Sequence, residues 1–209
     1  MSIDIRYLGP VACGKVQYNQ DAGNANVIVF RDDVWPHNDA NNTLGLTTVT
    51  YNPQTGEMYD ADMEINTAQQ AITLADPIPT DGFDFSSIVT HEAGHFLGLA
   101  HSQDSRATMY AHYKQGSTNM RYLAADDVSA ICDVYPPDGT RDTAAGNVAA
   151  VACDPTPRHG YSGDCATPAT ASKTCGVGPI GAEGDASGWS LIGLGPLALV
   201  VLRRRSKRS

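Results

Sequence analysis

The segment IVTHEAGHFLGLAH, residues 88–101, decides the fold of this chain. His91 and His95 are spaced i, i+4, so both imidazoles project from one face of a helix. Gly98 follows at the position where a helix commonly ends in a left-handed residue, and the chain can turn sharply there. His101 can then swing back toward the first two histidines. The segment predicts three imidazoles gathered around one point.

Three neutral imidazoles that leave a fourth tetrahedral position open to water are typical of a catalytic zinc site. Zinc lowers the pKa of such a water to about 7. Glu92, next to the first histidine, would take the proton of that water during attack on a carbonyl and then deliver it to the leaving amine. The sequence thus predicts His91, His95 and His101 as zinc ligands. The alternative is a metal site kept for structure, or a degenerate enzyme.

Helical periodicity surrounds this segment. A helix is predicted over 84–97, with Asp84 or Ser86 as the N-cap. Its apolar stripe consists of Ile88, Val89, Ala93, Phe96 and Leu97. A second helix is predicted over 124–134, because two prolines follow at 136 and 137.

Upstream segments have the alternation or apolar runs of β-strands. SIDIRYL (2–8) and NVIVF (26–30) are two candidate strands. Residues 43–51 and 57–66 form a further pair, joined by the turn sequence NPQTG. The order of elements predicts an α+β domain.

One face of the strand at 57–66 is acidic. Asp60, Asp62 and Glu64 alternate with apolar residues and therefore share a face. Two interpretations stay open. The carboxylates could bind calcium, which prefers oxygen ligands, or they could form a solvated strand face, which is the commoner arrangement and the one we favour.

The histidine motif with the serine that follows it, HEAGHFLGLAHS, resembles the metzincin metalloproteases, and Ser102 is typical of their matrixin branch. Met109, followed by Tyr110, is similar to the metzincin Met-turn beneath the zinc, and residues 123–136 are similar to the last matrixin helix. The resemblance covers residues 1–137. It implies a zincin/metzincin-like α+β fold with a twisted mixed sheet, an active-site helix and a C-terminal helix. It also implies a zinc-dependent endopeptidase whose site is supported by Gly98 and Met109.

The resemblance is incomplete in several places. Leu46 and Asp62 stand where matrixins have histidines for a second, structural zinc, and His37 is the one histidine upstream of residue 91. A second zinc is therefore not expected. Matrixin domains also begin with a strand and a long helix before the strand that residues 2–8 resemble, so we expect this sequence to begin inside the domain. Polypeptide substrates would lie beside the edge strand around 44–47, and the loop 111–121 departs from family patterns.

Composition changes beyond residue 137, which suggests three regions. These are the catalytic domain (1–137), a Gly-, Pro- and Ala-rich linker (138–174) and a C-terminal tail (175–209). The net charge is −9, and five of the 14 Lys and Arg residues lie in the last seven positions. An acidic body of this kind argues against nucleic-acid binding. Five cysteines leave at least one without a partner in the chain.

The tail has the features of a sorting signal. Its apolar stretch, 189–202, would make a helix of roughly 21 Å, short of a membrane span, and is followed by a basic cluster. It resembles the myxobacterial C-terminal sorting tail, in which a cysteine before the apolar stretch is processed. Cys175 would be that cysteine, lipidated after a tail-processing protease acts. The alternative is a plain C-terminal membrane anchor.

The tail predicts an exported protein at the cell surface or outer membrane, or one secreted after processing. An oxidising location makes Cys153–Cys165 a plausible disulfide within the linker. Cys13–Cys132 follows by elimination as a second pair.

Overall fold

The structure is a computed structural model that describes residues 5, 7–11, 13–136, 139–144, 146–148, 159 and 162. The strands are β1 (Ile28–Phe30), β2 (Gly45–Tyr51), β3 (Met58–Ile65), β4 (Ile72–Thr73), β5 (Phe83–Asp84), β6 (Arg141–Thr143) and β7 (Gly146–Val148). The helices are α1 (Phe85–Phe96), the 3-10 turn η1 (Asn119–Arg121) and α2 (Ala125–Val134). The α+β class predicted from the sequence is confirmed.

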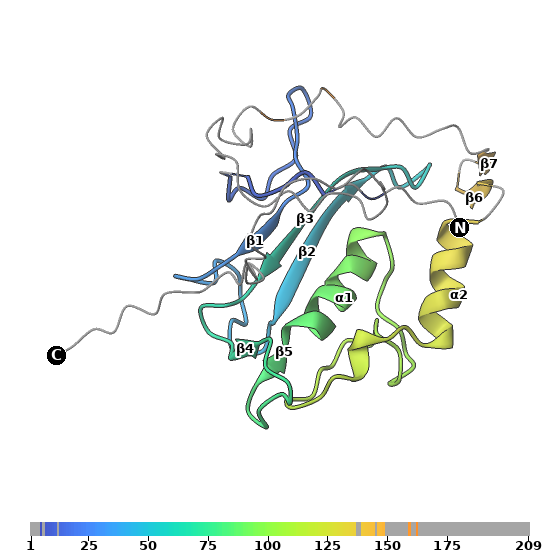
Figure 1. Ribbon diagram of the computed structural model, residues 1–209. Coiled ribbons are helices and arrows are strands. Elements are labelled where there is room, and N and C mark those ends of the chain that lie inside the picture. The colour runs from blue at the N-terminus through green and yellow to red at the C-terminus, as the bar shows by residue number, and fades with distance from the viewer. Residues whose placement is uncertain are drawn as a thin grey trace, which may run out of the picture. The chain divides into compact units, whose positions relative to one another are not determined.

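Three strands form the main sheet in the order β1-β3-β2. β1 runs parallel to β3, and β2 runs antiparallel to β3, so the sheet is mixed. β2 and β3 are joined by the predicted turn, in which Gly56 has a φ of 69° and donates from its N–H to the carbonyl of Asn52. β2 is an outer strand of this sheet and, among the described residues, pairs with β3 alone (Figure 1).

Helix α1 lies along one face of the sheet and contacts β2 and β3 (Figure 1). The core between them consists of Met63 and Ile65 from β3 and Ile88 from α1, all less than 4% exposed. Leu44, Ile72, Phe83, Phe85, Val89 and Ala93 pack around it. Of the stripe that the sequence periodicity predicts, Ile88, Val89 and Ala93 therefore belong to this core, whereas Phe96 and Leu97 lie outside it.

Both ends of α1 are fixed by identifiable caps. The side chain of Asp84 accepts hydrogen bonds from Ser87 N at 3.0 Å and Ser87 Oγ at 2.7 Å, which confirms Asp84 as the N-cap. At the other end Gly98 has a φ of 89° and donates to the carbonyl of His95, while Leu99 donates to the carbonyl of Gly94. This pair of bonds is a Schellman motif, and it reverses the chain after the helix.

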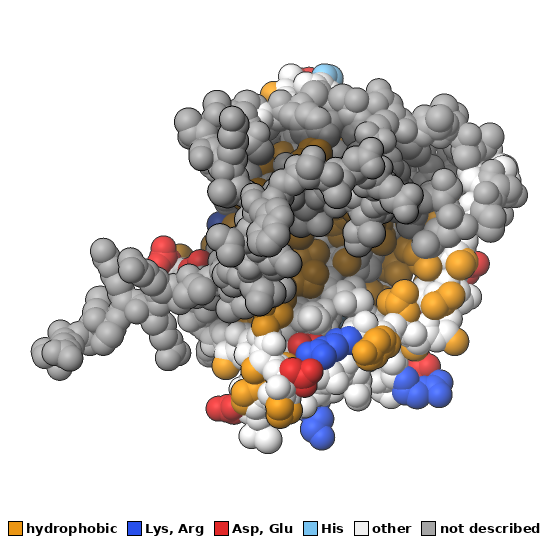
Figure 2. Space-filling view, in the orientation of Figure 1, with side chains coloured by type: hydrophobic (Ala, Val, Ile, Leu, Met, Phe, Trp, Pro, Cys, Tyr) orange, Lys and Arg blue, Asp and Glu red, His pale blue; other side chains and the backbone are white. Residues whose placement is uncertain are grey.

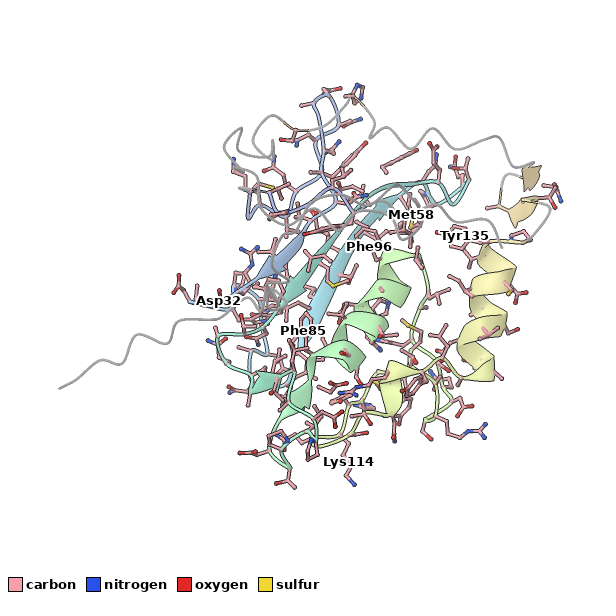
Figure 3. All side chains as sticks on the ribbon, viewed as in Figure 1. Asp32, Met58, Phe85, Phe96, Lys114 and Tyr135 are labelled. Atoms are coloured by element: carbon pink, nitrogen blue, oxygen red, sulfur yellow. The ribbon has the colours of Figure 1, made fainter. Side chains whose placement is uncertain are left out.

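A tyrosine and a methionine pack around the C-terminal end of α1. A Cβ added to Gly98 would lie 3.4 Å from the sulfur of Met58, the first residue of β3 (Figure 3). The hydroxyl of Tyr135, which follows α2, donates to the carbonyl of Leu97 at 3.0 Å. The two predicted helices are thus joined at this end by a direct hydrogen bond.

The predicted strand at 2–8 is wrong for the residues that the structure describes. Ile5, Tyr7 and Leu8 lie in no strand, and each is more than half exposed. Alternation predicts a strand only when a neighbouring strand pairs with it, and β1 pairs with β3 instead.

The solvated-face interpretation of the acidic stripe is also wrong. Asp60, Asp62 and Glu64 are each at most 4% exposed. The chain before and after β1 lies over them, since Asp62 accepts hydrogen bonds from the N–H groups of Gln17 and Val27. Arg31 and His37 bind the two oxygens of Glu64 at 2.5 and 2.7 Å. These buried carboxylates fix the chain that covers β3.

The cysteine pairing predicted by elimination is wrong as well. Cys132 on α2 is exposed and has a free thiol, whereas Cys13 is disulfide-bonded. The partner of Cys13 lies outside the described residues, as do Cys153, Cys165 and Cys175. The predicted tail, 175–209, also lies outside them. Within the part of the chain that the structure describes, no helix is long and apolar enough to cross a membrane.

Charged side chains of both signs are mixed on the face of the molecule in Figure 2. Lys and Arg side chains lie next to Asp and Glu side chains there, and the described residues on this face form no continuous basic surface.

The buried carboxyl pair on β3 predicts a pH-dependent stability. Burial, with Asp62 beside it, raises the pKa of Asp60 from its usual 3.8 to about 7. The folded state therefore binds a proton that the unfolded state releases above pH 4. Its stabilising effect is complete below the unfolded pKa and is lost as the pH rises through 7.

The variant Asp60→Asn has an amide in place of the protonated carboxyl. We expect its advantage over wild type in denaturant unfolding to be larger at pH 8 than at pH 5, by about 2 to 3 kcal/mol. Asp133→Asn, on the exposed side of α2, is the control and should show no such difference. An equal gain from Asp60→Asn at both pH values would contradict the expectation.

Candidate metal centre

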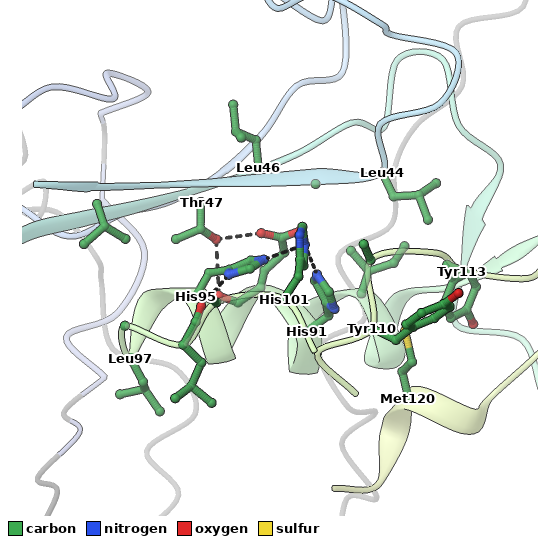
Figure 4. A pocket seen from close by; sticks show the side chains of 18 of the residues that line it. Leu44, Leu46, Thr47, His91, His95, Leu97, His101, Tyr110, Tyr113 and Met120 are labelled. Atoms are coloured by element: carbon green, nitrogen blue, oxygen red, sulfur yellow. Dashed lines mark hydrogen bonds between the residues drawn. The ribbon is translucent and has the colours of Figure 1, made fainter. Parts of the chain in front are cut away.

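The three predicted histidines converge in the structure. His91 and His95 come from α1, and His101 comes from the segment that the Schellman motif turns back (Figure 4). The Nε2 atom of His101 lies 3.3 Å from Nε2 of His91 and 3.1 Å from Nε2 of His95. In the described part of the chain, they form the one group of three or more metal-binding side chains close enough to hold an ion.

The ring orientations fit a metal ion. Nδ1 of His91 lies 2.6 Å from the carbonyl of Thr108, and Nδ1 of His95 lies 2.7 Å from the carbonyl of Leu99. A carbonyl only accepts, so each Nδ1 carries the hydrogen and each Nε2 presents a lone pair to the centre. This is the outer-sphere arrangement that zinc-binding histidines typically have. The donor set therefore fits zinc.

The imidazoles also have the charge state that a metal requires. Burial, together with the positive charge that His95 and His101 can carry, lowers the pKa of His91 to about 4, against the effect of the Thr108 carbonyl. Burial and His95 lower the pKa of His101 as well. Neutral imidazoles are the form that binds metal ions, so no proton has to leave these two rings near pH 7.

Glu92 lies on the same helix and points toward β2. Its carboxylate is buried, and its Oε2 accepts a hydrogen bond from Thr47 Oγ1 at 2.7 Å (Figure 4). Gly45, two residues earlier on β2, is so close that a Cβ there would lie 2.8 Å from Oε1 of Glu92. Burial raises the pKa of the Glu92 carboxyl, although the Thr47 hydrogen bond opposes the shift. A carboxylate with a raised pKa is a stronger base.

Met109 packs directly under the helix that holds the histidines. It is 3% exposed, and a Cβ added to Gly94 would lie 2.1 Å from its sulfur atom. The backbone N–H groups of Thr108 and Met109 donate to the two oxygens of Asp127 on α2, at 2.8 and 2.9 Å. Because Thr108 also supplies the carbonyl that binds His91, Asp127 fixes the turn that orients a histidine.

The loop after Met109 is tied to the start of α1. Arg121 donates through Nε and Nη2 to the two oxygens of Asp84, each at 2.8 Å. Burial alone would raise the pKa of Asp84, but the hydrogen bonds from Arg121 and Ser87 lower it overall. Gly116 N also donates to the carbonyl of Gly82. The second half of this loop is thus anchored beside the N-terminus of α1.

A groove of about 1270 Å³ runs past the histidines. Leu44 and the first residues of β2, up to Thr47, form one wall, and the loop with Tyr110 and Tyr113 forms the other (Figure 4). Phe83, Ile88 and Met120 line an apolar part of it. The histidines and Glu92 also line this groove, so an extended molecule lying in it would contact them.

Several residues of the site were not predicted from the sequence. Thr47, Gly45 and Asp127 each act through a contact between elements that are far apart in the chain, and no local spacing indicates those contacts. The calcium site considered for Asp60, Asp62 and Glu64 gains no support. Among the described residues, the oxygens of these three carboxylates do not form a group close enough to share one ion. Leu46 pairs with Glu64 across the sheet, and His37 contacts Glu64.

Asp127 offers a test of how the site is held. In Asp127→Asn an amide N–H₂ replaces one acceptor and faces a backbone N–H donor. We expect the affinity for zinc to fall about 10- to 100-fold, measured by competition with a chelating dye. We also expect the free energy of unfolding to fall by about 2 kcal/mol. Asp133→Asn, exposed on the same helix, is the matched control; equal losses in both variants would contradict this role of Asp127.

The sequence matches the matrixin family over residues 23–136, more than half of the chain. Matrix metalloproteinase-20 of Homo sapiens is 45% identical over 58 residues, 28% of this chain and 12% of that protein. Metalloendoproteinase 1 of Glycine max is 40% identical over 77 residues, 37% of this chain and 24% of that protein. Matrix metalloproteinase-C of Caenorhabditis elegans is 32% identical over 109 residues, 50% of this chain and 18% of that protein.

The chain thus spans less than a quarter of the length of each of these relatives. The matched region nevertheless contains β1 to α2, and with them the three histidines, Glu92 and Met109. On this match the chain belongs to the matrixin family.

Proposed function

We propose that this chain is a zinc-dependent endopeptidase. The observation that supports it best is the convergence of three histidine Nε2 atoms beside a buried carboxylate, at the side of an open groove. A structural zinc site closes its fourth position with a protein ligand, whereas a catalytic site leaves that position free. In the described residues the group contains three ligands and no fourth.

The roles of the residues follow from their positions. His91, His95 and His101 would hold the zinc, which as a Lewis acid acidifies water and polarises a carbonyl. Glu92 would accept the proton of the attacking water and later donate it to the leaving amine. Thr108 and Leu99 would keep the two helix histidines in the tautomer that the metal needs.

The substrate would be an extended polypeptide. β2 is an outer strand of the sheet and forms one wall of the groove, so its free edge can pair with the backbone of a bound peptide. The apolar part of the groove, lined by Phe83, Ile88 and Met120, would then hold a side chain next to the cleaved bond.

We further propose that the protein is exported and attached to the cell surface or outer membrane, or is secreted once its tail is processed. Only the sequence supports this proposal: an apolar segment at 189–202, a basic terminus and Cys175 before them. Cys175 would be the lipidated residue. Retention of a lipid after mild proteolysis, detected by mass spectrometry of the peptide that contains Cys175, would test the proposal.

The second candidate function is a surface-attached zinc-binding protein without catalysis. This function would hold if the three histidines bind zinc but Glu92 takes part in no reaction. The variant Glu92→Gln separates the two, because glutamine keeps the shape of glutamate but cannot accept the proton.

Under the proposed function, wild type binds one zinc ion and cleaves a denatured protein substrate. Glu92→Gln should keep its zinc, measured by mass spectrometry under native conditions, and lose cleavage by a factor of at least about 100. Glu57→Gln, in the same groove, is the control and should keep its activity. If wild type binds zinc yet cleaves no polypeptide, or Glu92→Gln is as active as wild type, the proposal is wrong.

A further inference from the structure

We infer that Thr47 is a positioning residue for the reaction: its hydroxyl holds the carboxylate of Glu92 in one orientation, against the backbone of Gly45. This inference rests on the proposed function, because it assigns Thr47 a role through Glu92. It concerns a strand residue that lies 45 positions away from Glu92 in the sequence.

The contacts of Thr47 fix one oxygen of the Glu92 carboxylate, Oε2. Thr47 Oγ1 lies 2.7 Å from Oε2 of Glu92 and 3.2 Å from the backbone carbonyl of the same residue. A hydroxyl has one hydrogen to donate, and the shorter contact to the carboxylate is the stronger of the two. The hydroxyl therefore binds the side chain of Glu92 while it stays close to its backbone.

The second oxygen is confined by Gly45. A Cβ at residue 45 would lie 2.8 Å from Oε1 and 2.9 Å from Cγ of Glu92. Gly45 and Thr47 are two residues apart on β2, so their substituents share one strand face. The Glu92 carboxylate is thus bound at Oε2 by Thr47, while Oε1 occupies the space that a side chain at residue 45 would fill.

This strand face is itself fixed by the core. Gly45 pairs with Ile65 and Thr47 pairs with Met63 across the sheet, and both partners are at most 2% exposed. The position of Thr47 is therefore set by packing, before any substrate binds. A misplacement of about 1 Å at a reacting group can cost on the order of 100-fold in rate, so a fixed position has kinetic value.

The test uses two substitutions at residue 47 in the full chain loaded with zinc. Thr47→Val has the same shape without the hydroxyl, and we expect kcat for a peptide substrate to fall about 10- to 100-fold. KM and zinc content should stay within twofold of wild type. Thr47→Ser retains the hydroxyl and should keep kcat within about threefold of wild type.

The matched control is Thr48→Val, which removes a hydroxyl from the next position of β2, where the side chain is exposed on the other face. It should leave kcat unchanged. The inference is overturned if Thr47→Val keeps the wild-type kcat, if Thr47→Ser is as impaired as Thr47→Val, or if Thr47→Val loses zinc. The last two results would show a packing role instead of a hydrogen-bonding role.

A measurement that needs no turnover separates this inference from the proposed function. Crystal structures of wild type and Thr47→Val would show whether the Glu92 carboxylate leaves its place beside Gly45. Displacement in the variant alone supports the inference, even if wild type cleaves no peptide, and an unmoved carboxylate overturns it. Failure of wild type to cleave any polypeptide with zinc bound counts against the proposed function only.

Discussion

The rest of the site depends on three imidazole nitrogens that converge on one point. Nε2 of His101 lies 3.1 Å from Nε2 of His95 and 3.3 Å from Nε2 of His91, and the two helix histidines each direct a lone pair to this point. The rings of His91 and His95 cannot turn away, because backbone carbonyls hold their Nδ1 atoms. A metal ion bound between these nitrogens would stabilise the fold as well as the site, because it binds the folded arrangement and not the unfolded chain.

The two carbonyls that hold the rings are placed by backbone geometry. Leu99 is turned toward His95 by the Schellman motif at Gly98, which needs a left-handed residue. Thr108 is turned toward His91 by Asp127, which accepts hydrogen bonds from two successive N–H groups of the turn. Because these are main-chain contacts, the orientation of the histidines depends on the ends of α1 and α2 more than on the side chains at 99 and 108.

The sequence predicted those features of the fold that depend on residues close together in the chain. The i, i+4 histidines, the Asp84 cap and Gly98 are each recognisable within a few residues, and α1, β2 and β3 are confirmed. The buried acidic face of β3 was missed because a period of two identifies a face without saying what covers it. Thr47 beside Glu92 and Asp127 beside Thr108 were missed because each contact joins elements brought together only by the sheet register and helix packing.

The acidic face of β3 contributes to the site from the far side of the sheet. Glu64 is buried with Arg31 and His37 on its two oxygens, an arrangement in which the loss of one partner would leave a charge uncompensated. That contact holds β3 against the chain around β1, and β3 in turn fixes the register of β2. Since the strand face formed by Gly45 and Thr47 confines Glu92, the orientation of the proposed base depends on packing at both faces of β3.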